Sequence, residues 1–124
     1  MKLLVFLAVG GAAGTLARYG LGGLVQPAGS TFAWGTLVVN VTGSFALGFL
    51  MRWLLGSSVA TPELRAALTV GFCGAFTTMS TFSYETIMLL EDGQSLRAAA
   101  YVAGTLGASL AGVFSGLVLG GRLL

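Results

Sequence analysis

The sequence predicts an all-α integral membrane protein with four transmembrane helices, and two observations lead to this fold class. First, 56% of the 124 residues are hydrophobic and only 8% are charged, with a mean hydropathy of +0.93. A soluble domain has about 25% charged residues, so this chain has too few to cover a surface in water. Second, long uncharged stretches separate the charged residues, and a transmembrane helix needs about 20 mostly apolar residues. We therefore expect one membrane domain, residues 1–124, with the lipid bilayer as its solvent.

The composition also excludes several classes of function. The formal net charge is +2 and there is no basic run, so nothing predicts a partner nucleic acid. The chain has one cysteine, Cys73, and no histidine, which rules out an internal disulfide and a Cys/His zinc site. A serine or cysteine nucleophile activated by histidine is excluded as well, and we expect no enzyme activity.

The first two predicted spans cover residues 3–24 and 32–55, and the turn sequence QPAGS at 26–30 separates them. The N-terminal stretch also imitates a cleaved signal peptide, with Lys2, an apolar run and small residues at 10–14. Because apolar sequence continues past these small residues to Leu24, we expect a retained helix instead.

The third and fourth predicted spans cover residues 66–90 and 98–119, linked by the short segment EDGQSLR at 91–97. Ahead of the third span, Thr61 is a predicted N-cap, with Pro62 at the first helical position and Glu63 in the first turn.

Charges in the loops give only a weak prediction of orientation. With four spans, both termini share one side of the membrane. That side carries Lys2, Arg52, Arg65 and Arg122, and the other carries Arg97 and Arg18. Lys and Arg favour the cytoplasmic side, but this difference is small, so one orientation or both stay open.

Glycines recur at every fourth residue in two spans, at Gly112, Gly116 and Gly120 and again at Gly10 and Gly14. Small residues at this spacing let helix backbones approach closely in lipid. These glycines pack helices together either within one subunit or between subunits. Four helices make a thin bundle with little interior, which favours an oligomer.

Polar side chains in two spans are spaced to share one helix face. In the second span Thr36 and Asn40 are four residues apart, and the Asn40 amide suits either one interhelical hydrogen bond or a ligand. In the fourth span Tyr101, Thr105 and Ser109 repeat every four residues, so their hydroxyls form one row. A single hydroxyl can bond back to its own helix, but a row of three predicts a polar track.

The third span contains the sequence GFCGAFTTMSTFSYE, residues 71–85, which suits an unbroken helix poorly. Gly71 and Gly74 weaken a helix, and TTMST is a poor helix former. We expect an unwound segment over residues 74–80 near mid-membrane, which is tolerated only where protein or a polar cavity surrounds it. Its free carbonyls suit a cation and its N–H groups an anion, or the break is a kink without a ligand.

Four more side chains flank these polar groups. Met79 and Phe82 border the predicted break, where the ring edge of Phe82 either faces an anion or packs in the ordinary way. Glu85 and Arg18 lie near span ends, which suits a pore mouth or an anchor at the lipid–water boundary. Because hydroxyl and amide donors outnumber embedded carboxylates, the residues favour a small channel or carrier for an anion.

Three motifs in order resemble the Fluc/CrcB family of fluoride channels: GGAAGTLARY at 10–19, GTLVVNVTGSFALG at 35–48 and GFCGAFTTMSTFSYE at 71–85. The similarity covers nearly the whole chain in length, number of spans and motif order. It implies passive, selective export of fluoride across a bacterial inner (plasma) membrane. It also implies an antiparallel, dual-topology homodimer with two pores, whose subunits cross at the broken third span.

The resemblance implies roles for individual residues. A central structural sodium ion would be held by the main-chain carbonyls of Gly74 and Thr77 from each subunit. The implied fluoride pore consists of Thr36, Asn40, Met79, Ser80, Phe82, Tyr101, Thr105 and Ser109, with Arg18 and Glu85 at its vestibule. One position departs from the family pattern, because TTFSTFS is here TTMSTFS, with Met79 in place of a pore phenylalanine. Methionine can fill the same volume but lacks the ring edge, and we expect conduction to survive the change.

Two other classes of function compete with this reading. A small four-span drug/proton antiporter needs an embedded carboxylate early in the chain, and the first span has only Arg18. A structural membrane subunit would pack through Gly and Ala, which does not explain a row of hydroxyls.

Overall fold

The computed structural model describes residues 1–124 and is entirely helical. Its elements are α1 (Lys2–Val25), α2 (Trp34–Gly56), α3 (Pro62–Ala66), the π-helix η1 (Ala67–Cys73), α4 (Gly74–Phe76), α5 (Met79–Glu91) and α6 (Ser95–Arg122). Three of them, α1, α2 and α6, are long and apolar enough to cross a membrane. The sequence-based expectation of a helical membrane protein is confirmed at this level.

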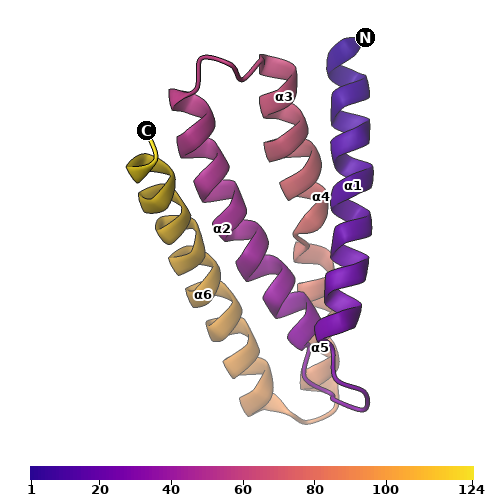
Figure 1. The fold of residues 1–124 in the computed structure, drawn as a ribbon. Helices are drawn as coiled ribbons and strands as arrows, with labels where there is room; N and C mark the ends of the chain where they lie inside the picture. The colour runs from indigo at the N-terminus through magenta and orange to yellow at the C-terminus, as the bar shows by residue number, and fades with distance from the viewer.

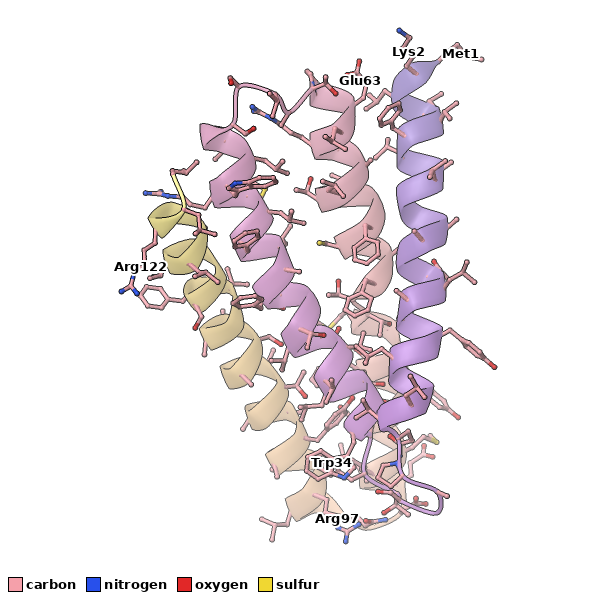
Figure 2. The ribbon with its side chains drawn as sticks, viewed as in Figure 1. Met1, Lys2, Trp34, Glu63, Arg97 and Arg122 are labelled. Carbon is pink, nitrogen blue, oxygen red and sulfur yellow. The ribbon has the colours of Figure 1, made fainter.

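The two ends of the bundle carry different residues. Both chain termini lie at the same end, where Lys2, Glu63 and Arg122 also lie, and Trp34 and Arg97 lie at the opposite end (Figures 1 and 2). In Figure 1, α2 stands between α6 on one side and α1 with the α3–α5 segment on the other. The connections are short, and Gly29 in the predicted QPAGS turn has the positive φ of +76° that favours glycine.

Glycines lie at the closest helix contacts. The three repeated glycines of α6, Gly112, Gly116 and Gly120, all pack against the backbone of α2 in the same chain. A Cβ on Gly116 would collide with the Phe45 carbonyl of α2, and one on Gly120 would press on the Phe49 carbonyl. Gly10 and Gly14 of α1 stand equally close to backbone carbonyls of η1. Of the two uses open from the sequence, the structure therefore shows packing within one subunit at these positions.

The segment from α3 to α5 begins as an α-helix and widens into the π-helix η1. After α4 the helical conformation is interrupted for two residues. The N-cap prediction is confirmed, because Thr61 Oγ1 accepts a hydrogen bond from Leu64 N at 3.2 Å. Thr77 (φ −84°, ψ 157°) and Thr78 (φ −147°, ψ 118°) are extended, and α5 starts at Met79. The expected unwinding over residues 74–80 is too long, since residues 74–76 and 79–80 are helical. The π-helix was not foreseen; such widened turns occur often at functional sites.

The chain has little interior of its own. Only 18 of 124 residues are buried, so most apolar side chains must be covered by lipid or by another chain. The one buried cluster consists of Phe82, Leu89, Ala98 and Tyr101, where α5 and α6 meet. This cluster fixes the position of the row of α6 hydroxyls relative to the helix interruption.

Candidate functional site

The interruption between α4 and α5 is held by one side chain from α2. Asn40 Nδ2 donates to the Thr78 carbonyl oxygen at 3.0 Å, and Thr78 N donates to Asn40 Oδ1 at 2.7 Å. Both backbone groups of Thr78 are thereby satisfied where no helical partner exists for them. An unsatisfied backbone group costs several kcal/mol in lipid, so this pair of bonds stabilises the break. One N–H of the Asn40 amide is left over, because the amide carries two donors.

Two hydroxyls from different helices converge on Glu85 of α5. Thr36 Oγ1 donates to Glu85 Oε1 at 2.9 Å, and Tyr101 OH donates to Glu85 Oε2 at 2.7 Å. The carboxylate therefore points into the bundle, and each of its two oxygens accepts one hydrogen bond from the chain itself. Tyr101 is fully buried, and its ring lies 5.2 Å from that of Phe82, centroid to centroid.

A first cavity, of about 520 Å³, lies between α1, α2 and α5. Its lining includes Arg18, Thr36 and Glu85, so the two predicted vestibule residues open onto one space. Gln26 also lines this cavity, and its amide ties the α1–α2 loop together by donating to the carbonyls of Ser30 and Phe32 and accepting from Gly35 N. These bonds give the cavity a fixed wall beside an arginine and a carboxylate.

A second cavity, of about 290 Å³, also borders the interruption and is lined there by Gly74, Thr77 and Met79. The predicted pore residues that line it are Asn40, Met79, Phe82, Thr105 and Ser109. Thr105 Oγ1 and Ser109 Oγ are buried oxygen atoms without any hydrogen-bond partner. A buried hydroxyl without a partner costs about 1–3 kcal/mol, so a polar ligand that reached these two atoms would be stabilised by them.

Thr78 lines both cavities and was not singled out from the sequence. Its side chain is the N-cap of α5, where Oγ1 accepts from Thr81 N at 3.2 Å. The signal was present: threonine directly before a resumed helical pattern is a favoured N-cap. Cys73, Thr15 and Thr81 are further cavity residues that the sequence analysis missed.

The remaining predicted residues are placed as follows. Ser80 is exposed and lines neither cavity, although its Oγ lies 3.4 Å from Thr78 Oγ1. Gly74 and Thr77 line the second cavity. A Cβ built on Gly74 would meet nothing within 4 Å, and the Thr77 carbonyl oxygen accepts no hydrogen bond within the chain. These two positions thus offer open backbone, as a cation held by carbonyls would require.

Fold and site together define a class: a helical membrane protein with polar side chains gathered around a helix interruption inside the bundle. A family model described as CrcB-like protein, Camphor Resistance (CrcB), matches residues 5–117. The chain belongs to this CrcB family.

Three relatives with similar sequences have the same name, fluoride-specific ion channel FluC. The fluoride-specific ion channel FluC of Geobacter sulfurreducens is 45% identical over 99% of this chain and 100% of its own length. The fluoride-specific ion channels FluC of Rhizobium meliloti, at 44% identity over 96% of both chains, and of Chlorobaculum tepidum, at 45% identity over 96% and 94%, are similar to the same extent.

Proposed function

We propose that this chain forms a fluoride-selective channel through which fluoride leaves the cytoplasm passively, so that cytoplasmic fluoride falls. The observation that carries the proposal is the pair of partnerless hydroxyls, Thr105 Oγ1 and Ser109 Oγ, in the cavity that Asn40 and Phe82 also line. Hydroxyl donors are the groups that can replace water around a small anion. The names of the relatives point to fluoride as that anion.

In the proposed path, an anion meets Arg18 first and then the hydroxyl and amide donors. Arg18 raises the local anion concentration at the wide first cavity. Deeper in the bundle, Thr105, Ser109 and the unspent N–H of Asn40 replace hydration, as polar linings do in selective pores. The positive edge of the Phe82 ring offers a further weak contact to a desolvated anion.

The proposal includes a fourth, interrupted span and an antiparallel homodimer. Residues 62–76 and 79–91 together have about the length of the long helices, although neither piece is long enough alone. The small interior and the many exposed apolar side chains favour a second copy that covers part of them. Two copies in opposite orientations, with two pores in a bacterial inner membrane, fit the weak bias of loop charges.

A structural sodium ion at the dimer centre is part of the same proposal. The backbone at Gly74 and Thr77 fits this ion, because the first is uncrowded and the second has a free carbonyl. These carbonyls would hold the cation, which would supply a positive charge that joins the two subunits.

The test is fluoride efflux from liposomes that contain the purified protein, loaded with potassium fluoride and read with a fluoride electrode. Valinomycin carries the balancing potassium, and parallel liposomes with potassium chloride measure selectivity. Fast fluoride release with no chloride release is expected. A folded, reconstituted protein that releases no fluoride would remove this function from the chain.

A further inference from the structure

The two ends of the bundle differ in charge. The end that contains both chain termini has a net side-chain charge of +3, from Lys2, Arg52, Arg65 and Arg122 against Glu63 (Figure 2). The charges of the two termini cancel each other. The opposite end has a net side-chain charge of −1, from Arg97 against Glu91 and Asp92. We propose that the first end binds the phosphate of one anionic phospholipid between Arg52 of α2 and Arg122 of α6.

Arg52 extends from α2 across the last turn of α6. A Cβ built on Gly120 would lie 3.1 Å from Arg52 Cβ, and one built on Gly121 would lie 3.3 Å from Arg52 Nε. Arg122 is the next residue of α6 and the last one of that helix. Because neither glycine has a side chain to hold the helices apart, the two arginines are neighbours across the contact between α2 and α6.

The guanidinium groups of this pair have unused N–H donors. The arginine side chains that donate within the chain are Arg65, to the Ser57 carbonyl oxygen at 3.3 Å, and Arg97, to a threonine hydroxyl at 2.8 Å. Arg52 and Arg122 are exposed and donate to no group of the chain. A guanidinium group presents its donors in a planar fork that matches two phosphate oxygens, so these two free groups suit a phosphate.

The two tryptophans of the chain place the arginine pair at the depth of the lipid headgroups. Trp34 and Trp53 lie near opposite ends of α2, about 28 Å apart at 1.5 Å per residue, and the hydrocarbon core of a bilayer is about 30 Å thick. Both are partly exposed, as is usual for tryptophans at the two boundaries of a membrane. Arg52 directly precedes Trp53, and a Cβ on Gly120 would lie 3.4 Å from Trp53 N. The ends of α2 and α6 therefore reach the same boundary.

Exposed apolar side chains lie on the membrane side of the arginine pair. Met51 of α2 and Val118 and Leu119 of α6 are 44, 40 and 42% exposed. A phospholipid fits both features, because its acyl chains cover these side chains while its phosphate meets the guanidinium groups. A free phosphate would meet the guanidinium groups alone, so the surface favours the lipid.

The net charge of this end selects the type of headgroup. Phosphatidylglycerol has one net negative charge, whereas phosphatidylcholine adds a positive ammonium group to its phosphate. A charge of +3 attracts the first headgroup and repels the ammonium group of the second. Glu63, the one carboxylate side chain at this end, lies on α3 away from Arg122 (Figure 2).

The test is native mass spectrometry of the purified full-length protein in a neutral detergent. The protein is titrated with phosphatidylglycerol and, separately, with phosphatidylcholine that has the same acyl chains. Phosphatidylglycerol should bind about fivefold tighter or more. Arg52→Gln and Arg122→Gln should each weaken its binding about fivefold, the equivalent of about 1 kcal/mol per arginine at a membrane surface. Both side chains are exposed, so the variants should fold, and thermal unfolding without lipid checks this.

Arg97→Gln is the matched control, because it removes the same charge from the opposite end of the bundle. Its binding of phosphatidylglycerol should change by less than about twofold, under about 0.4 kcal/mol. Equal weakening by Arg97→Gln and Arg52→Gln would overturn the site, because only the overall charge would then matter. Equal binding of the two lipids by the wild type would overturn it as well, since no headgroup would then be recognised.

Inorganic phosphate distinguishes a lipid site from a site for a free anion. Potassium phosphate equimolar with the lipid, at constant ionic strength, should leave phosphatidylglycerol bound, because it lacks acyl chains. Displacement of the lipid by phosphate would overturn the proposal and assign the arginine pair to a free anion. No step of this experiment measures fluoride, so its result is independent of the proposed function.

Discussion

Two neighbouring groups of hydroxyls differ in whether they form hydrogen bonds within the chain. Thr36 and Tyr101 both donate to Glu85, at 2.9 and 2.7 Å. Thr105 and Ser109, one and two turns further along α6 than Tyr101, have buried oxygens with no partner. The bonded hydroxyls hold helices together, whereas each unbonded hydroxyl costs free energy until a ligand or a water provides its partner. The difference separates a structural cluster around Glu85 from a binding track beyond it.

Asn40 connects the two groups, and its removal should have the largest effect. Asn40→Ala leaves both backbone groups of Thr78 without partners and deletes the spare N–H from the second cavity. The two unsatisfied backbone groups destabilise the break, and we expect a fluoride rate lower by on the order of a hundredfold, which corresponds to about 2.7 kcal/mol of lost anion contact. Efflux from liposomes, at matched protein density, measures it.

Thr42→Ala is the matched control for Asn40→Ala. Thr42 lies on the same helix, is exposed, and its hydroxyl bonds only to its own helix at the Val38 and Val39 carbonyls. Its variant should conduct like the wild type. Equal fluoride efflux rates for the Asn40 and Thr42 variants would show that conduction does not need the two hydrogen bonds between Asn40 and Thr78.

Thr105→Val tests the unsatisfied group directly, because it nearly keeps the shape and replaces the hydroxyl with a methyl group. Protein without a ligand should be equally or more stable, since a buried oxygen without a partner is lost. Fluoride efflux should fall by about tenfold, the equivalent of about 1.4 kcal/mol of lost anion contact. A destabilised protein with unchanged efflux would mean that the oxygen has a structural partner instead.

Tyr101→Phe tests the satisfied group and should give the opposite pattern. It removes the 2.7 Å bond to Glu85 and keeps the buried ring. A hydrogen bond to a charged group contributes about 1.5–3 kcal/mol, so the midpoint of thermal unfolding in detergent should fall. Efflux should fall less than in Thr105→Val. A strong loss of efflux with an unchanged midpoint of thermal unfolding would place Tyr101 in the binding track and not in the structural cluster.

This contrast marks the limit of what the sequence could predict. The four-residue spacing put Tyr101, Thr105 and Ser109 on one face correctly, because helix periodicity is a local property. It could not show that Glu85 takes the first hydroxyl, since that depends on how α5 meets α6. The glycine repeats likewise predicted close packing, but only the structure shows α2 as the partner of α6.

The main error of the sequence-based prediction was the length of the helix interruption, which was predicted to be too long. TTMST has low helix propensity, which predicted unwinding over residues 74–80. The structure confines it to Thr77 and Thr78, because Thr78 caps α5 and Asn40 replaces the missing backbone partners. Propensity is a weak local preference that such tertiary bonds override.

Met79→Phe should have the smallest effect on fluoride efflux. Met79 lines the second cavity but is 66% exposed, so a phenyl ring of similar volume can turn outward without repacking the bundle. The donors Thr105, Ser109 and Asn40 stay in place, and the added ring edge offers at most a weak contact to an anion. The rate should change by less than about threefold, under about 0.7 kcal/mol. Efflux reduced as strongly as in Asn40→Ala would show that methionine itself shapes the track, and that the hydroxyls alone do not define it.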